Sequence, residues 1–258
     1  MNALMTSLTN EFLKPEWDAP LSIHTLVTKR TGGVSLGPFD SFNLGDHVGD
    51  SPENVLANRA LLRTYLPADP IWLKQIHGVK VSTPNRRLLE ADAVVTNIPN
   101  EVLAIMTADC LPVLFTNQSG TVIGAAHAGW RGLCAGVLEN TVTEMTKLIH
   151  QDADKNIIAW LGPAIGPQAF EVGQDVLNAF QDFGISYPQS AFLSIAEKPG
   201  KYLADIYLLA RSRLESVGVD QIFGGQYCTV TQADQFFSYR RDGETGRFAS
   251  LIWISDAK

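Results

Sequence analysis

Three residues able to bind a metal ion each stand at one end of an apolar run and beside small residues: His77, Cys110 and His127. Imidazole nitrogen and thiolate sulfur suit Zn²⁺, and three such ligands leave the fourth tetrahedral position open for water or substrate. Structural zinc sites are usually closed by four protein ligands. We therefore predict that these residues bind one catalytic metal ion, zinc.

Each of these residues also has a simpler interpretation, because the spacing between them is wide. The histidines could be satisfied core or loop residues, and Cys110 could be a small buried side chain. Cys110 could also be a thiolate nucleophile activated by His127 or His77, which would make the protein a cysteine hydrolase. Asp109, directly before Cys110, is a candidate for proton transfer or for bracing a ligand histidine.

A glycine-rich junction follows His127, with Gly129 and Gly132 placed before an expected helix. Free N–H groups at the start of a helix attract anions, and Arg131 would add positive charge. The junction is either a phosphate cradle or a tight turn that needs glycine for packing. The GxxxxGK[ST] pattern is missing, so the junction is not a P-loop.

The other cysteines and histidines are interpreted as structural or solvated. Cys134 lies on the apolar side of an expected helix and Cys228 in an expected strand, so both are predicted to be small core residues. Three cysteines without a CxxC pattern fit a reducing compartment. His24 and His150 are expected to be structural or solvated, whereas His47 either contacts substrate or braces its loop.

Composition limits the classes of function. The 258 residues are 45% hydrophobic, which predicts one large folded domain over residues 1–258. A net charge of −7 without a basic stripe argues against nucleic-acid binding. The first residues lack a signal-peptide pattern, and no apolar run approaches a membrane span, so we expect a cytoplasmic protein with no membrane partner. The sequence predicts no oligomeric state.

Strands and helices are expected to mix without strict alternation, which favours an α/β (α+β) fold with a mixed β-sheet flanked by helices. Ser51 with Pro52 predicts the start of a helix. The glycine-rich segment 31–50 is long for an irregular stretch, so we expect it to help form the substrate pocket, with Asn43 contacting substrate. Expected strands lie at 21–28, 71–76, 102–106, 112–115, 121–126, 157–161, 226–230 and 248–254, and further helices begin at Leu133 or cover 173–180 and 206–216.

A set of short motifs runs along the chain at 31–35, 43–50, 75–78, 91–93, 107–112, 127–132, 161–165, Asp205 and 240–248. In these motifs the sequence resembles the laccase-domain family, also called the polyphenol oxidase or peptidoglycan-editing-factor family. The resemblance covers nearly the whole chain, and the family's members are assigned as purine nucleoside phosphorylases. It implies zinc on His77, Cys110 and His127, and a sandwich fold akin to a bacterial toxin's cysteine-hydrolase domain.

The resemblance further implies phosphorolysis of adenosine, inosine and S-methyl-5′-thioadenosine, with some deamination of adenosine. Purine nucleoside and phosphate are then the expected partners, and the candidate phosphate-binding residues are Arg30, Arg59, Arg131 and Arg241. Two other functions stay open: a cysteine hydrolase editing a peptidoglycan precursor, and copper-dependent polyphenol oxidation. The latter fits poorly, because a multicopper oxidase uses about ten histidines and this chain has five. Copper could still replace zinc adventitiously.

Overall fold

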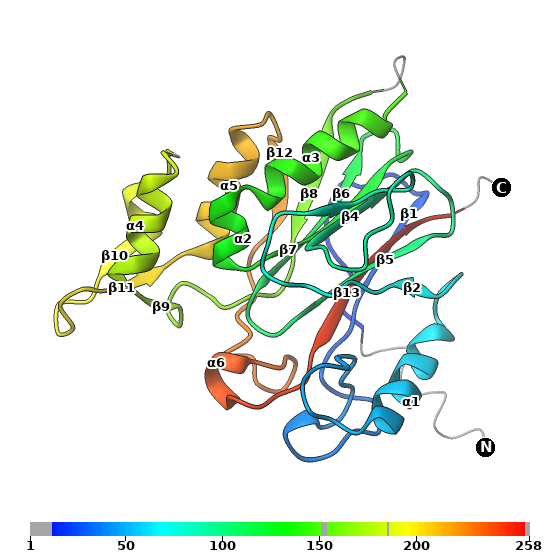
Figure 1. The fold of residues 1–258 in the computed structure, drawn as a ribbon, viewed down its shortest axis with the longest axis horizontal. Helices are drawn as coiled ribbons and strands as arrows, with labels where there is room; N and C mark the ends of the chain where they lie inside the picture. The colour runs from blue at the N-terminus through cyan, green and yellow to red at the C-terminus, as the bar shows by residue number, and fades with distance from the viewer. Residues whose placement is uncertain (1–11, 151–153, 185, 256–258) are drawn as a thin grey trace.

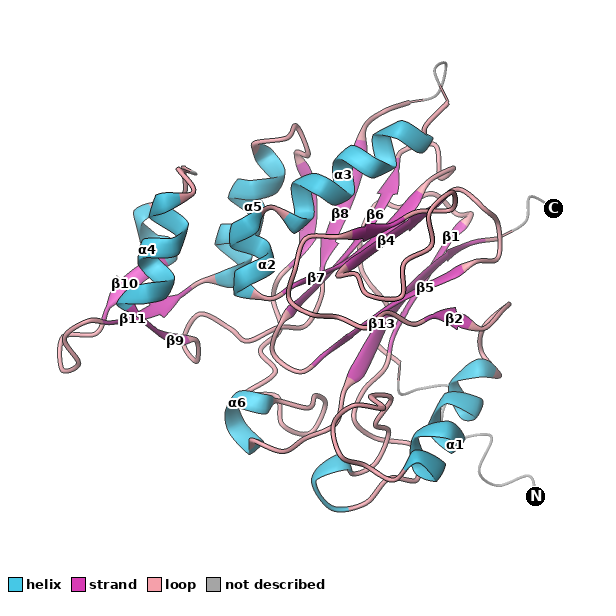
Figure 2. Ribbon diagram, viewed as in Figure 1, coloured by secondary structure: helices cyan, strands magenta, loops and turns pink. Residues whose placement is uncertain are grey.

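The computed structural model describes residues 12–150, 154–184 and 186–255. Its elements form layers built on two β-sheets, with helices on the outer faces (Figures 1 and 2). The fold is thus the predicted mixture of mixed sheets and flanking helices. None of the helices in the described part of the chain has the length and apolarity that a membrane crossing requires.

The larger sheet has six strands in the order β12-β8-β6-β7-β4-β3. Its central strands are continuous apolar runs, as expected for strands covered on both faces. The pairs β12–β8 and β3–β4 are parallel, and the other neighbours are antiparallel. Their bounds are β3 Val81–Ser82, β4 Ala93–Thr96, β6 Leu111–Asn117, β7 Ile123–Ala128, β8 Ile157–Leu161 and β12 Gln221–Gly224.

The smaller sheet has the order β1-β13-β5-β2 and packs against the larger one. Alternation along β5 shows how: Leu103 and Ile105 join the core between the sheets, whereas Ala104 and Met106 face the opposite side. That opposite side is covered by α1 (Pro52–Arg63). The strands are β1 Ile23–Val27, β2 Pro70–Ile71, β5 Val102–Thr107 and β13 Phe248–Ile254.

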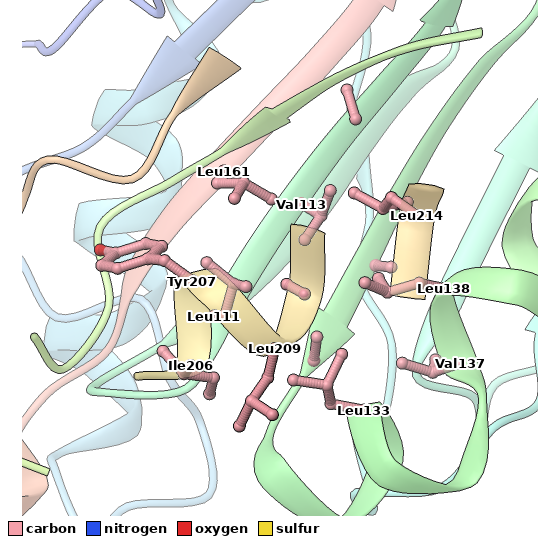
Figure 3. Close-up of a cluster of buried hydrophobic side chains, with 14 of the residues drawn as sticks. Leu111, Val113, Leu133, Val137, Leu138, Leu161, Ile206, Tyr207, Leu209 and Leu214 are labelled. Carbon is pink, nitrogen blue, oxygen red and sulfur yellow. The ribbon is translucent and has the colours of Figure 1, made fainter. Parts of the chain in front are cut away.

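Helices α2 (Trp130–Ala135), α3 (Val137–Leu148) and α5 (Ile206–Glu215) cover the outer face of the six-stranded sheet. Gly136 separates α2 from α3 with a φ of 98°, a left-handed conformation that suits glycine. The single helix predicted from Leu133 is therefore two helices, the first of which begins at Trp130. Figure 3 shows the core below them, where side chains of the sheet meet those of the helices: Leu111, Val113, Leu133, Leu138 and Leu209.

A smaller unit extends from the edge of these layers (Figure 1). Three antiparallel strands in the order β10-β11-β9 carry α4 (Gln174–Asp182) beside them. A short helix, α6, covers Tyr239–Asp242. The three strands are β9 Glu171–Gly173, β10 Phe192–Ser194 and β11 Lys201–Ala204, and 3₁₀ turns lie at Gly37–Phe39 and Gln189–Ala191.

Two predicted strands are wrong. The run 71–76 pairs as a strand only at Pro70–Ile71, and the rest is irregular. The strand placed at 226–230 lies earlier in the chain, at Gln221–Gly224. It ends there because Gly224 and Gly225 take φ values of 74° and 90°, which turn the backbone out of the sheet. Cys228 is therefore a half-buried loop residue, unlike Cys134, which is 2% exposed in the core as predicted.

Candidate metal centre

His77, Cys110 and His127 lie together although they are far apart in the sequence. Their ligand atoms are all within 4.8 Å of one another, and Cys110 Sγ is 3.7 Å from His77 Nε2. His127 comes from the buried strand β7, Cys110 from the turn between β5 and β6, and His77 from the irregular segment after β2. Among the described residues, no other group of three His, Cys, Asp or Glu residues has this arrangement.

The spacing of these atoms fits a metal ion of the size and chemistry of zinc. Zn–N bonds are about 2.0–2.1 Å and Zn–S bonds about 2.3 Å, so ligand atoms at tetrahedral angles around one ion lie about 3.3–3.6 Å apart. His77 is exposed, Cys110 is half-buried and His127 is buried. The centre therefore has a closed side within the sheet and an open side toward solvent, where a substrate could approach.

Asp92, directly before β4, bonds two of the three candidate ligand residues. Its Oδ1 lies 2.9 Å from Nδ1 of His127, which leaves Nε2 of that ring free for a metal. The same carboxylate accepts hydrogen bonds from the backbone N–H groups of His77 at 2.8 Å and Gly78 at 2.7 Å. Asp92 is fully buried. Asp92, not Asp109, therefore braces one of the candidate ligand histidines.

Side chains also explain why the segment before His77 is not a strand. The Gln75 amide accepts from the Met106 N–H at 2.9 Å and donates to the Met106 carbonyl at 2.8 Å. One side chain thus satisfies the two groups that a neighbouring strand would have bonded. His77 itself has a φ of 62°, in the left-handed region that is uncommon for residues other than glycine. Such strain persists where surrounding contacts fix it, often at functional sites.

Charges inside the centre favour a thiolate at Cys110. Burial alone would raise the pKa of this thiol, but the positive charge of His127 and hydrogen bonds from both histidines lower it to about 6. Burial would likewise lower the pKa of His127, but Cys110 and Asp92 raise it to about 9. The directions of both pKa shifts therefore favour a thiolate–imidazolium pair of Cys110 and His127 in the metal-free protein.

The two glycines after His127 are needed for close packing. A Cβ on Gly129 would lie 2.8 Å from Cδ2 of His77 and 3.0 Å from Sγ of Cys110. A Cβ on Gly132 would lie 2.7 Å from the carbonyl oxygen of Gly78. These contacts support the tight-turn interpretation of the junction.

Two pockets share His77 and Cys110 as a common wall. The first has a volume of about 310 Å³, and its lining includes the polar side chains His47, Gln75 and Arg247. The second, of about 270 Å³, is lined mainly by apolar and aromatic side chains with arginines at its rim: Trp130, Arg131, Ile165, Phe170, Ile206 and Arg240. Tyr239 borders both pockets.

Arg247 is the arginine of the first pocket. Its Nη1 donates to the carbonyls of Thr245 and Gly246, whereas Nε and Nη2 have no hydrogen-bond acceptor among the described residues. Burial lowers the pKa of this guanidinium, and the nearby Cys110 and Asp109 oppose that shift. A charged, half-buried group with unused donors is suited to binding an anion.

The predicted substrate-binding residues lie in different places. Arg131 lines the second pocket, stacked on Trp130 at 4.4 Å. Arg59 borders an adjacent cavity with His47, paired to Asp46 at 3.3 Å. The other three do not line either pocket, because their polar groups bond the backbone or neighbouring side chains: Arg30, Arg241 and Asn43.

Asn43 braces its loop instead of facing a pocket. Its amide donates to Gly45 O and Asp50 Oδ2, and its oxygen accepts from the N–H groups of Gly45 and Arg247. The side chain is fully buried. The segment 31–50 reaches the first pocket through His47.

Residue types alone did not reveal Asp92, Arg247, Gln75 or Tyr239. Three of them lie inside the motif segments 75–78, 91–93 and 240–248, and Tyr239 directly precedes the last of these. That proximity was the available signal, because an isolated Asp, Gln or Arg has no pattern that marks its role. Their functions depend on contacts across the fold.

Known proteins resemble the chain over nearly its full length. The family model described as multi-copper polyphenol oxidoreductase laccase matches residues 24–255. "Purine nucleoside phosphorylase YfiH" of Escherichia coli K12 is 51% identical over 250 residues, covering 95% of this chain and 99% of that protein. A purine nucleoside phosphorylase of Haemophilus influenzae is 51% identical over 246 residues, covering 94% and 98%.

Solved structures give the same picture. A Neisseria meningitidis protein, 48% identical, matches with a TM-score of 0.85 over 95% of this chain and 99% of its own. The protein YfiH of Bacillus licheniformis, 30% identical, matches with a TM-score of 0.83 over 90% and 93%. The matched region includes the whole candidate metal centre.

Proposed function

The chain belongs to the family described as multi-copper polyphenol oxidoreductase laccase, and from that premise we propose that it is a zinc-dependent purine nucleoside phosphorylase. The proposed substrates are phosphate with adenosine, inosine or S-methyl-5′-thioadenosine, and deamination of adenosine is the proposed side activity. The observation that carries the proposal is the three-ligand centre open to two unlike pockets. The relatives named as purine nucleoside phosphorylases supply the reaction class.

The ligands argue against a multicopper oxidase. Several copper ions need several sets of imidazole ligands, and the described residues hold one cluster of two histidines and a cysteine. His24 lies on the exposed side of β1, where its ring stacks on Trp253 with 5.5 Å between the ring centroids. It is not part of the His-Cys-His cluster. Cu²⁺ binds nitrogen and sulfur ligands more tightly than Zn²⁺ does, so adventitious copper would explain trace oxidation.

Phosphorolysis needs an anion beside the anomeric carbon of a nucleoside. A phosphate oxygen forms a bond to C1′ while the bond from C1′ to the base nitrogen breaks, and the base leaves with that electron pair. Arg247 offers free donors to the phosphate, and His47 lines the same pocket. The aromatic side chains Trp130 and Phe170 of the second pocket suit the flat, apolar faces of a purine.

His77, Cys110 and His127 would hold the zinc ion between these pockets. When bound, zinc supplies a Lewis acid that stabilises negative charge on an oxygen. Asp92 keeps His127 in the tautomer with a free Nε2. β7 lies inside the six-stranded sheet, and His127 on this strand is 3% exposed. Water is therefore kept away from this side of the centre.

The test is product analysis of nucleoside reactions with and without phosphate. We expect free base and ribose 1-phosphate in equal amounts when phosphate is present, and no ribose 1-phosphate without it. With adenosine, a smaller amount of inosine formed without phosphate would support the deaminase side activity. Free ribose as the sugar product at every phosphate concentration would show that the enzyme is a hydrolase instead.

A second candidate function, thiol hydrolysis of an amide in a cell-wall precursor, is favoured by one observation. Cys110, His127 and Asp92 stand in series, as nucleophile, base and orienting carboxylate do in thiol hydrolases. In that case Cys110 would act in metal-free protein, and removing metal with a chelator would leave amide hydrolysis intact. If all activity is lost when the metal is removed, the result supports the phosphorylase.

A further inference from the structure

Asp109 stands in a constrained conformation directly before Cys110. Its φ is 94°, within the left-handed range, and its side chain is 8% exposed. A non-glycine residue keeps such a conformation only when neighbouring contacts determine it. The contacts of Asp109 therefore show which part of the structure depends on this strained conformation.

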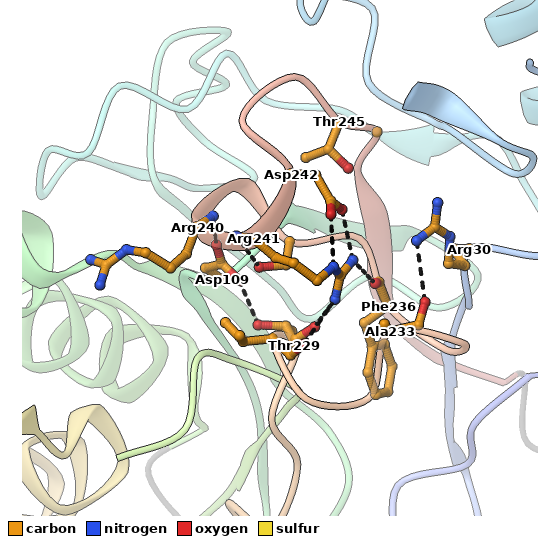
Figure 4. A network of polar contacts seen from close by, with 12 residues as sticks. Arg30, Asp109, Thr229, Ala233, Phe236, Arg240, Arg241, Asp242 and Thr245 are labelled. Atoms are coloured by element: carbon orange, nitrogen blue, oxygen red, sulfur yellow. Dashed lines mark hydrogen bonds and ion pairs between the residues drawn. The ribbon is translucent and has the colours of Figure 1, made fainter. Parts of the chain in front are cut away.

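Both carboxylate oxygens of Asp109 accept short hydrogen bonds from the C-terminal part of the chain (Figure 4). Oδ1 accepts from the Thr229 hydroxyl at 2.6 Å, and Oδ2 accepts from the Arg240 backbone N–H at 2.6 Å. The Asp109 carbonyl accepts from the N–H of Ile165 at 2.9 Å. Within the described residues, neither carboxylate oxygen bonds a ligand histidine.

The segment that Asp109 holds is the turn of α6, which forms a wall of both pockets. Tyr239, 62% exposed, borders both of them. The Arg240 guanidinium donates to the carbonyl of Glu171 at 3.0 Å and lies 5.7 Å from the Phe170 ring centroid, at the rim of the second pocket. The α6 turn therefore connects Asp109, which precedes Cys110, with the walls of both pockets.

Arg241 closes the network on its other side. Its Nη1 donates to the Thr229 carbonyl at 2.7 Å, and its Nη2 donates to the Phe236 carbonyl at 3.1 Å. Thr229 is thus bonded through its hydroxyl to Asp109 and through its carbonyl to Arg241 (Figure 4). A shift of the Asp109 side chain would loosen both Thr229 and the α6 turn.

We propose that Asp109 is a positioning residue that fixes the Tyr239–Arg240 turn against Cys110 and so keeps the two pockets aligned on either side of the metal ligands. Its carboxylate acts as a pair of hydrogen-bond acceptors and transfers no proton to substrate. The functional consequence rests on the proposed phosphorylase activity, whereas the structural one can be measured without it.

Substitution by asparagine separates positioning from acid–base chemistry. Asparagine tolerates positive φ, and its oxygen can accept from the Arg240 N–H while its NH₂ group donates to the Thr229 hydroxyl. Alanine removes both bonds, and neither variant can transfer a proton. If Asp109 is a positioning residue, Asp109→Asn should keep its catalytic activity and Asp109→Ala should lose it. If Asp109 is a catalytic acid or base, both variants should lose activity.

The experiment compares Asp109→Asn, Asp109→Ala, Thr229→Val and the exposed control Asp69→Ala, with metal content measured for each. We expect kcat/KM per bound metal to fall about 100-fold in Asp109→Ala, the cost of misplacing a site by about 1 Å. It should stay within about 3-fold of the wild type in Asp109→Asn. Hydrogen exchange of the peptide with residues 239–242 should accelerate in Asp109→Ala and in Thr229→Val, and should stay at the wild-type rate in Asp109→Asn and Asp69→Ala.

Two results would overturn the proposal: Asp109→Asn as slow as Asp109→Ala with the exchange of the wild type, or Asp109→Ala with wild-type kinetics. If Asp109→Ala does not fold, Thr229→Val supplies the test through a raised KM and faster exchange, and wild-type values in both would contradict us. If the variants differ in hydrogen exchange as predicted but the wild type shows no phosphate-dependent turnover, the proposed function is refuted and the positioning role stands.

Discussion

Replacing Asp92 should weaken both the fold and the metal centre. Its carboxylate makes three hydrogen bonds shorter than 3.0 Å: those with Nδ1 of His127 and with the N–H groups of His77 and Gly78. A buried donor left without a partner costs about 1–3 kcal/mol, and water can reach the exposed His77. We therefore expect Asp92→Ala to lower the free energy of unfolding by about 3–5 kcal/mol.

Asp92→Asn is the better variant for the metal site, because it is nearly isosteric but keeps a single acceptor oxygen. Losing a carboxylate that orients a ligand histidine typically weakens metal binding 10- to 100-fold. Urea unfolding of the metal-free proteins gives the stabilities, and competition with a chromophoric chelator gives the zinc affinities. Asp69→Ala is the matched control, since the Asp69 side chain is 91% exposed.

The pH dependence of the stability gives an independent check. Burial raises the pKa of Asp92, but hydrogen bonds from His127 and from the N–H groups of Gly78 and His77 lower it overall. A carboxyl whose pKa is lower in the folded state stabilises the protein above its unfolded pKa of about 3.9, and this contribution is lost as pH falls. The stability difference between the wild type and Asp92→Asn should thus shrink below about pH 4. Equal stabilities at pH 7, or unchanged zinc affinity, would refute this account of Asp92.

Three further predictions concern the same centre. Gly129→Ala should lower zinc affinity at least 10-fold, because its Cβ would lie 3.0 Å from Cys110 Sγ; wild-type affinity in the chelator assay would show that the loop can shift freely. Zinc binding near pH 7.5 should release about one proton from the Cys110–His127 pair, whose pKa values are about 6 and about 9. Calorimetry in buffers of different ionisation enthalpy measures the number of protons released. No proton release would contradict the thiolate–imidazolium pair. Cys134→Ala should destabilise the fold by about 1–2 kcal/mol in urea unfolding while activity per folded molecule is unchanged, and lost turnover in folded protein would mean that the wrong thiol was assigned.

Local patterns predicted the parts of the fold whose stability is local or fully buried. The apolar runs 157–161 and 248–254 are strands with those bounds, because strands covered on both faces need an uninterrupted apolar sequence. The helix from Pro52 begins where predicted, with Ser51 Oγ accepting from the Asn54 N–H. These features depend on residues within a few positions of one another.

The failures have a common cause in long-range side-chain contacts. The run 71–76 is apolar enough for a strand, but the Gln75 side chain bonds the Met106 backbone in place of a paired strand, and Asp92 accepts from the N–H groups of Ile76 and His77. The three ligands were predictable as residue types at the ends of apolar runs. The roles of Arg247 and Asp92 are not predictable in this way, since the sequence separations of 14 to 35 residues between Asp92 and its partners carry no pattern.

The most direct test of the central claim is a zinc titration of metal-free protein, followed by phosphate-dependent cleavage of adenosine. We expect turnover to be absent at the start, to rise linearly and to level off at one zinc per chain, with Cys110→Ser shifting the titration to much higher zinc concentrations. Alkylation of Cys110 should slow in step with the same titration, because a bound thiolate is a poor nucleophile. Full turnover in metal-free protein, or a plateau at several metal ions per chain, would contradict a single catalytic zinc on His77, Cys110 and His127.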